Sequence, residues 1–236
     1  PFKDNLKLRQ ALSMAVDRNI LTDKITKAGE IPAYGWVPPG VNNYNSQQLD
    51  YANMPKAERL KKAQQLYQEA GYSKGNPLTL EIRYNTSENH KKIAIAISAM
   101  WKMNLGIRTR LINEEWKVFL ENRKQKKLRE AFRGGWIGDY NDAFTFAELM
   151  QSSHGINDSG YDNPEYDKLL EQAANEGDLD KRRDIMEAAE RMLLQDHAIM
   201  PLYFYVTKHL IKPYVKGYTP NILDHTYSKN LWITKH

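Results

Sequence analysis

The sequence of 236 residues contains no cysteine. Disulfide bonds, cysteine-ligated zinc or iron–sulfur centres, and thiol nucleophiles are therefore excluded. It also has no run of the roughly 18–20 apolar residues that a membrane-spanning helix needs, and residues 1–30 lack the apolar segment of a signal peptide. The net charge of +5 is spread over 27% charged residues of both signs, so we expect no nucleic-acid partner.

Sequence motifs for catalysis and for cofactor binding are also missing. None of the six histidines stands in a metal-ligand spacing such as H-E-x-x-H, and there is no G-x-S-x-G elbow and no P-loop. Gly134, Gly135 and Gly138 do not match the dinucleotide fingerprint G-x-G-x-x-G, and they fall within a predicted strand rather than before a helix. The sequence therefore predicts neither a metal site nor a cofactor.

One pair of carboxylates leaves a catalytic alternative open. Asp139 and Asp142 are the type of acid pair that a glycosidase uses, but their spacing in the sequence does not fix their distance. The simpler interpretation is a polar turn at 139–142 whose side chains bond to their own backbone. The basic run 123–127 is likewise interpreted as a solvated turn, since no nucleic-acid module surrounds it.

Periodicity and capping residues predict the order of helices and strands. The clearest unit is a strand at Leu78–Tyr84, a helix at Glu88–Met103 and a strand at Ile107–Ile112, a βαβ unit with parallel strands. Further helices are expected at 8–27 in one or two pieces, at 55–70, 114–122 and 143–150, and from Pro164 and Asp178 onward. Further strands are expected at 128–137, 199–206, 209–212 and 231–234, and a long loop at 29–53 that either carries function or wraps a surface. This order indicates an α/β or α+β domain whose sheet is covered by helices.

Residues 133–142 concentrate the features of a binding site. Three glycines let another backbone approach the predicted strand closely, and Trp136 beside them offers a stiff apolar wall. Asp139 comes directly after this glycine-rich stretch and can hold a cation there. Arg133 comes directly before it and can hold an anion. A short peptide has a repeated backbone and one charge of each sign, and an exposed strand binds such a backbone without sequence preference. The alternative is a glycine-bearing strand packed on a helix, with Arg133 and Asp139 as surface charges.

Four stretches of the sequence resemble one family. They are 12–20 with 31–39; 84–94, which reads YNTSENHKKIA; Glu115-Trp116-Lys117 with 133–141; and the ending 212–236. They are similar to the carboxy-terminal part of the periplasmic oligopeptide-binding proteins, the cluster C, family 5 solute-binding components of peptide ABC importers.

The resemblance implies an α/β fold, a lobe of the type II periplasmic binding proteins with a mixed sheet flanked by helices. Residues 1–205 would form the large third domain, and 206–236 would return to a first domain that this chain lacks. We then expect a chain that begins downstream of a signal peptide and two further domains. The implied protein is a periplasmic monomer, not an enzyme, that binds short peptides by closure of two lobes and delivers them to the membrane permease of an ABC importer.

The resemblance also assigns roles to single residues. Asp139 would pair with the peptide's α-amino group. The backbone of Gly135, Trp136 and Ile137 would pair with the peptide's backbone, and Trp116 and Trp136 would line side-chain pockets. The peptide's carboxylate would be met by basic side chains, chosen according to peptide length: Arg133, His90 and Arg123. A murein-peptide or other specialised peptide binder, and a chaperone that holds extended segments, remain alternatives.

Overall fold

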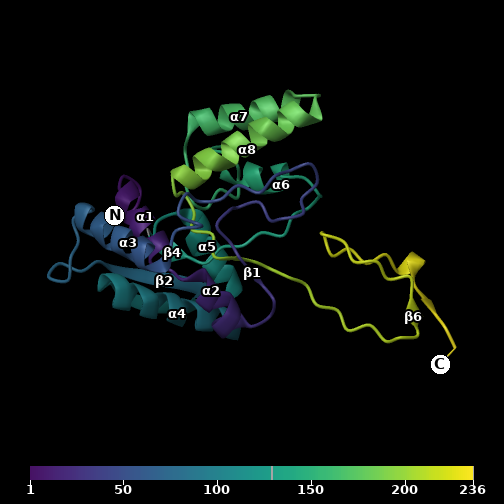
Figure 1. Ribbon diagram of the computed structural model, residues 1–236, viewed down its shortest axis with the longest axis horizontal. Coiled ribbons are helices and arrows are strands. Elements are labelled where there is room, and N and C mark those ends of the chain that lie inside the picture. The colour runs from purple at the N-terminus through teal and green to yellow at the C-terminus, as the bar shows by residue number, and fades with distance from the viewer. Residues whose placement is uncertain (129, 236) are drawn as a thin grey trace.

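The computed structural model describes residues 1–128 and 130–235. Figure 1 shows a body of helices around a small sheet and a C-terminal arm that extends away from it. The helical segments are α1 (Leu6–Met14), α2 (Arg18–Ile20), the π-helix η1 (Leu21–Thr26), α3 (Lys56–Glu69), α4 (Glu88–Leu105), α5 (Trp116–Gln125), α6 (Phe144–Ala147), the 3₁₀ turn η2 (Glu148–Met150), α7 (Pro164–Asn175), α8 (Leu179–Gln195) and the 3₁₀ turn η3 (Ser228–Asn230). The strands are β1 (Ile31–Pro32), β2 (Thr79–Asn85), β3 (Arg108–Glu114), β4 (Ala131–Phe132), β5 (Tyr203–Phe204), β6 (Val215–Lys216) and β7 (Trp232–Ile233).

The predicted βαβ unit is confirmed. Strands β2 and β3 pair in parallel over their whole length, from Thr79 opposite Arg108 to Asn85 opposite Glu114. Helix α4 connects them and ends at Gly106, whose left-handed backbone (φ 75°) is readily adopted by glycine. The alternation of apolar residues and the terminal glycine therefore predicted this part of the fold correctly.

The three-stranded sheet has the order β3-β2-β4. On the side of β2 away from β3, Ile82 and Arg83 pair in parallel with β4. Antiparallel pairing occurs in two separate two-stranded sheets, β1 with β5 and β6 with β7. The α/β class is confirmed, with parallel and antiparallel pairs in different sheets.

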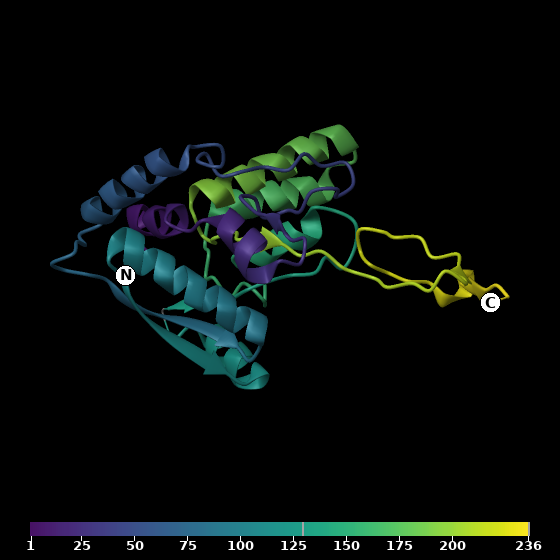
Figure 2. The ribbon, with the colours of Figure 1, turned by 60° about the horizontal axis from the view of Figure 1, so that its bottom comes forward.

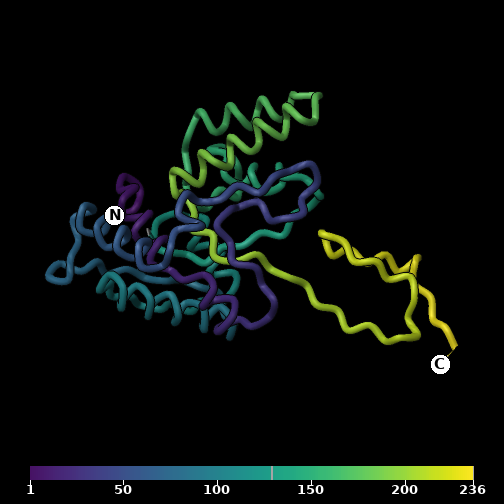
Figure 3. Tube along the Cα trace, in the orientation of Figure 1, coloured from purple at the N-terminus to yellow at the C-terminus, as the bar shows by residue number. Residues whose placement is uncertain are grey.

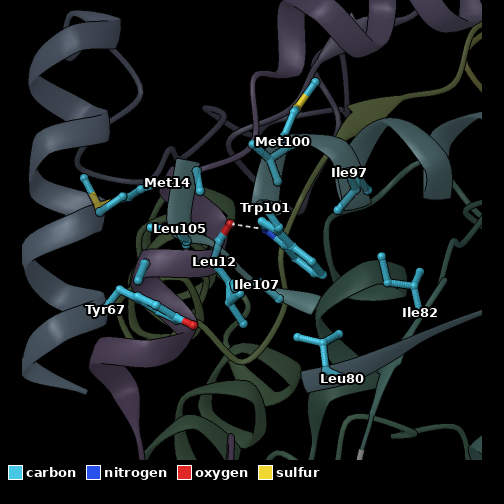
Figure 4. Packing of buried hydrophobic residues seen from close by; sticks show 14 of the residues in the cluster. Leu12, Met14, Tyr67, Leu80, Ile82, Ile97, Met100, Trp101, Leu105 and Ile107 are labelled. Atoms are coloured by element: carbon cyan, nitrogen blue, oxygen red, sulfur yellow. Dashed lines mark hydrogen bonds between the residues drawn. The ribbon is translucent and has the colours of Figure 1, made fainter. Parts of the chain in front are cut away.

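The two faces of β2 meet different surroundings, because successive side chains of a strand point to opposite faces. Leu80, Ile82 and Tyr84 belong to the first hydrophobic core, together with the buried side of α4. Figure 2 shows α4 on one side of the sheet and α5 on the other. Figure 4 shows the centre of this core, where the Trp101 indole N–H donates to the Leu12 carbonyl at 2.9 Å and so joins α4 to α1.

The face of the sheet toward α5 carries charge instead. Arg83 donates to Glu114 at 2.6 Å and to Glu81 at 2.5 Å, which links all these side chains across β2 and β3. Asn122 of α5 donates to the same Glu114 carboxylate at 2.7 Å. Because these groups are largely shielded from water, their hydrogen bonds fix α5 over the sheet.

A second hydrophobic core lies among α6, η2, α7 and α8. The loop 29–53 runs along this unit, as Figure 3 shows, and is attached to α8 by Glu190. This carboxylate is buried, and it accepts from the Trp36 and Val37 amides at 2.6 and 2.9 Å and from the Tyr44 hydroxyl at 2.5 Å. Burial raises the pKa of Glu190, and these donors partly oppose that change. The predicted long loop is thus a wrapping segment with its own buried anchor.

Arg18 is fully buried, which its charge would not predict. Its guanidinium donates to the carbonyls of Ala33 and Pro201 at 2.7 and 2.8 Å, and also to Ser13 and to the Tyr51 hydroxyl. Within the described part of the chain it has no carboxylate partner. Arg18 therefore joins the first helices to the two chain segments that form β1 and β5.

Three strand predictions were wrong. The strand expected at 128–137 is reduced to β4, which pairs only with Ile82 and Arg83 of β2, and the one at 199–206 is reduced to β5, which pairs only with the two residues of β1. Residues 209–212 form no strand, and Leu210 is fully exposed without a neighbouring strand in the described ranges. Of these segments, Arg129 lies outside the described residues, as does His236 at the chain end. The strand expected at 231–234 is confirmed as β7, in a hairpin with β6.

The arm that begins near residue 206 ends in this hairpin, well away from the body (Figures 1 and 2). It carries exposed apolar side chains, among them Trp232 and Ile233 at 59% and 69% exposure. No helix in residues 1–128 and 130–235 combines the length and apolarity needed to cross a membrane.

We expect Arg18→Lys to lower the free energy of unfolding by roughly 3 kcal/mol or more, since an ammonium cannot reproduce the guanidinium's spread of donors and leaves buried carbonyls unpaired. Urea unfolding followed by circular dichroism measures this. Arg108→Lys is the matched control, because the Arg108 side chain is exposed and unpaired in the described chain, and it should change stability by less than about 0.5 kcal/mol. Similar effects of the two changes would contradict the anchoring role.

Candidate functional site

The basic residues predicted for the site lie around one edge of the three-stranded sheet. Because β3, β2 and β4 are parallel, their carboxyl ends meet there: Asn85 ends β2, Glu114 ends β3 and Arg133 follows β4. In the sheet, β3 lies on one side of β2 and β4 lies on the other side. Where the strand order of an open α/β sheet reverses in this way, a crevice forms beyond the carboxyl ends of the strands, and ligands bind in it.

His90 lies at this edge because helix α4 begins directly after β2. The Ser87 side chain caps the helix and accepts from the His90 amide at 3.4 Å. Burial, and then the positive charge of Arg133, lower the pKa of His90 below its ordinary 6.5. Its Nδ1 atom is buried and has no hydrogen-bond partner in the described part of the chain. A hydrogen bond with the Asn85 backbone acts in the opposite direction, but the pKa stays lowered, so the ring is neutral near pH 7 and lies beside Arg133.

Arg133 continues the pairing of β4 by one hydrogen bond, from its amide to the Arg83 carbonyl at 2.9 Å. Its guanidinium donates to the Tyr205 hydroxyl at 2.6 Å and lies 6.0 Å from the centre of that ring. Among residues 1–128 and 130–235 it has no carboxylate within ion-pair distance. Its charge is thus available to a ligand anion.

Trp116 is the first residue of α5, and the helix begins there because Glu115 caps it, accepting from the Lys117 amide at 2.8 Å. The Trp116 ring stacks on buried Phe119 with ring centres 6.2 Å apart, and it is 48% exposed. An aromatic plane that is half open to solvent is a suitable wall for an apolar ligand side chain.

Arg123, at the other end of α5, already has an ionic partner. Its Nε atom lies 2.6 Å from a carboxylate oxygen of Asp158. The same guanidinium donates to the Arg133 carbonyl at 3.4 Å and lies 5.5 Å from the centre of the Phe119 ring. Arg123 is therefore next to the edge, but its charge is compensated within the protein.

The segment 134–138 corrects the prediction of a long strand. It pairs with no strand, and its backbone amides have no hydrogen-bond partners in the described part of the chain. The chain leaves β2 here because it crosses to the second core. Gly138 lies so close to α6 that a Cβ on it would be 3.0 Å from the Phe146 ring. The next residue, Asp139, donates its amide to the Thr145 hydroxyl of α6 at 3.1 Å. Gly135 and Ile137 are exposed, so this backbone is open to a ligand.

Asp139 and Asp142 differ in their surroundings. The exposed Asp139 carboxylate has no hydrogen-bond or ion-pair partner in the described ranges. Asp142 forms a two-point pair with Arg182 at 2.7 and 2.9 Å. Burial acts to raise the pKa of Asp142, but the hydrogen bonds from Arg182 and the Phe144 amide lower it below its ordinary value. An ionised, fixed Asp142 is unsuited to the protonated acid of a glycosidase.

The structure brings His90, Arg133 and Arg123 together at the sheet edge, with Trp116 on the adjoining helix. Trp136 instead packs on the second core, and its indole Nε1 is buried without a partner in the described chain. Asp139 lies at the end of the crossing segment, beside α6. The predicted residues are therefore divided between the sheet edge and the second core.

Sequence reasoning missed two residues at this edge. Tyr205 contacts Arg133, and its signal was the run Tyr203-Phe204-Tyr205, whose alternation places both tyrosines on one face, with their hydroxyls 3.1 Å apart. Asp158 pairs with Arg123 across 35 residues of sequence, and no local pattern indicates that contact.

Two cavities of about 440 and 330 Å³ lie away from this edge, one beside α7 and the other between α1, α3 and α8. The second contains His197, which stacks on Tyr51 and whose pKa burial lowers to about 4. Neither cavity includes a residue that was predicted to bind ligand. The sheet edge is an open face, and an open face has no enclosed volume until another surface covers it.

Comparison with known proteins connects this arrangement to a family. Residues 1–158 match the bacterial extracellular solute-binding proteins, family 5, middle region. The whole chain is 42% identical to the periplasmic oligopeptide-binding protein OppA of Haemophilus influenzae, over 44% of that protein's length. It is 40% identical to the periplasmic murein peptide-binding protein MppA of Escherichia coli, with 98% of this chain and 43% of that protein covered. The chain thus spans less than half the length of the curated relatives that it matches.

The fold agrees with these sequence matches. A crystal structure of Haemophilus influenzae OppA in complex with the peptide RPPGFSPFR superposes with a TM-score of 0.88 at 41% identity, covering 98% of this chain and 46% of that one.

We expect Arg133→Gln to raise the pKa of His90, because it removes a positive charge that disfavours a second one. NMR titration of the histidine rings from pH 4 to 9 measures this. His197 is an internal control, since its low pKa arises from burial and from Arg9 and Arg18 and should not move. An unchanged His90 titration in the variant would show that the two side chains are not electrostatically coupled.

Proposed function

The chain belongs to family 5 of the bacterial extracellular solute-binding proteins, and from this membership we propose that it binds short peptides in the periplasm for delivery to an ABC importer. One observation carries the proposal: an exposed segment with unpaired backbone amides lies between an uncompensated cation, Arg133, and an uncompensated carboxylate, Asp139. A zwitterionic peptide matches this polarity at its two ends and along its backbone.

The dimensions are compatible with such a ligand. Arg133 and Asp139 are six steps apart in the sequence, which an extended chain spans in at most about 20–22 Å, and a peptide of three to five residues spans about 10–18 Å. In this arrangement Asp139 pairs with the peptide's α-ammonium group. Arg133 and neutral His90 meet its carboxylate. Trp116 and Trp136 form the walls of the side-chain positions, where loosely packed and hydrated space allows many side chains.

The open face of the site suggests a second lobe. Ile137 is 80% exposed and Trp116 is 48% exposed, which is costly for a site that excludes water unless another surface covers it. We propose that a further domain closes over this edge, and that residues 206–236 pack against such a domain through their exposed apolar side chains. Closure would follow the hinge motion of periplasmic binding proteins, in a monomer that then docks on a membrane permease.

A murein-peptide binder is the second candidate, because the identity to the murein peptide-binding relative, 40%, is close to that with the oligopeptide binder. Competition between an ordinary tripeptide and one that contains a D-amino acid separates the two. We propose no enzymatic activity: the Asp142–Arg182 pair argues against the glycosidase alternative, and turnover of an aryl glycoside that is lost in Asp139→Asn would be needed to revive it.

Binding is tested by calorimetric titration of tri- and tetrapeptides. Two samples are compared: the 236-residue chain, and a hybrid in which this chain replaces the aligned residues of Haemophilus influenzae OppA. We expect the hybrid to bind and the chain alone to bind at least about tenfold more weakly, because only the hybrid has a second lobe. Equal affinities would contradict the two-lobe proposal, and a hybrid that binds no peptide would contradict peptide binding itself.

We expect Asp139→Asn to lower the hybrid's affinity for a tripeptide with a free amino terminus by about tenfold or more, since it removes the partner of the ligand's ammonium. The N-acetylated form of the same tripeptide is the matched control and should bind the variant and the parent within about threefold. If both peptides lose affinity equally, Asp139 supports the fold rather than the ammonium.

A further inference from the structure

The two arginines at the sheet edge differ in how their charges are compensated. Arg133 donates to a neutral hydroxyl, that of Tyr205, at 2.6 Å. Arg123 pairs with the Asp158 carboxylate at 2.6 Å, and these two side chains are only 17% and 18% exposed. A pair so far removed from water is screened less than a surface salt bridge. Of the two cations, the protein itself neutralises only Arg123 within the described ranges.

The loop between η2 and α7 holds Asp158 in place. Its neighbour Asn157 is 3% exposed and donates to the carbonyls of Gln151 and Tyr161 at 3.0 and 2.7 Å. The Asn157 side-chain oxygen accepts from the Ser159 hydroxyl at 2.8 Å and from the Gly160 amide at 3.1 Å. Because Asn157 closes the loop on itself, the carboxylate of Asp158 is presented to α5 in a fixed position.

Arg123 is fixed from its own side as well. Its guanidinium lies over the Phe119 ring and donates to the carbonyl of Arg133, the residue that precedes the exposed segment. Its side chain thus reaches the ligand edge while its charge is used by Asp158. A ligand carboxylate that approaches Arg123 meets the Asp158 carboxylate at the same place, and one that approaches Arg133 does not.

We propose that Asp158 is a specificity-determining residue: it is an internal carboxylate that masks Arg123, so that the site prefers peptides whose carboxylate reaches Arg133. This inference rests on the proposed peptide binding and adds a selection rule to it. A peptide whose carboxylate is directed to Arg123 must displace Asp158, which leaves that carboxylate largely buried and unpaired. Peptides of this kind bind about tenfold more weakly than they would to an unmasked Arg123.

The test uses free-acid and C-terminally amidated forms of tri-, tetra- and pentapeptides of one composition. At each length, the dissociation constant of the amidated peptide divided by that of the free acid measures how much the ligand's carboxylate contributes to binding. These ratios are determined by calorimetry in the hybrid with Haemophilus influenzae OppA and by NMR titration in the 236-residue chain.

In Asp158→Asn the ratio should rise by about tenfold at one or more of the three lengths. In the double variant Arg123→Gln with Asp158→Asn it should return to within about threefold of the parent. Asp162→Asn is the matched control, because this exposed acid of the same loop has no ion-pair partner in the described chain, and it should leave every ratio unchanged. Thermal unfolding of each variant checks that the loop remains folded.

Two results would overturn the masking role. One is an unchanged ratio at all three lengths in Asp158→Asn. The other is a ratio in the double variant that falls about tenfold below that of the parent. Such a fall would mean that Arg123 already contacts the ligand's carboxylate in the parent, while it is still paired with Asp158. A parental hybrid that binds none of the peptides would instead contradict the proposed function, and this inference with it.

Discussion

Parallel pairing on both sides of β2 is the constraint on which the site depends. It places the carboxyl ends of three strands at one edge, and the seven-residue register with β3 aligns Asn85 with Glu114 there. Because β3 and β4 lie on opposite sides of β2, the chain must leave this edge in two directions. The groups that follow the strands, His90 on α4 and Arg133 after β4, thereby face a common space without belonging to the same element.

The rest of the chain holds this edge open rather than filling it. Two hydrophobic cores lie on either side of the segment that runs from Arg133 to Asp142. Two buried charged residues stabilise their surroundings: Arg18 joins the first helices to β1 and β5, and Glu190 attaches the long loop to α8. Residues 134–138, in contrast, leave their backbone amides without partners in the described part of the chain, and Gly134, Gly135 and Ile137 are exposed. These amides are therefore free to pair with the backbone of a ligand, which is the basis of the proposed peptide site.

The sequence predicts elements well where local physics decides them. Alternating apolar residues, the Ser87 cap and Gly106 are enough to define the βαβ unit, and Asn163 and Asp178 mark the starts of α7 and α8. The local pattern of 133–142 indicated Arg133, Trp136 and Asp139, whereas His90, Trp116 and Arg123 were named from a resemblance. The structure places the basic side chains together. What could not be predicted depends on distant contacts. Strand β4 ends at Phe132 because the chain turns to the second core, and the Arg123–Asp158 pair and the burial of Arg18 join residues far apart in sequence.

In the proposed complex a peptide lies along residues 134–138 with its ends at opposite charges. A crystal structure of the hybrid protein with a bound tripeptide tests this most directly. We expect the ligand's ammonium within ion-pair distance of Asp139, its backbone hydrogen-bonded to the amides of the segment, and its carboxylate at Arg133 and His90. A tripeptide bound in the opposite direction, or in the cavity between α1, α3 and α8, would contradict it.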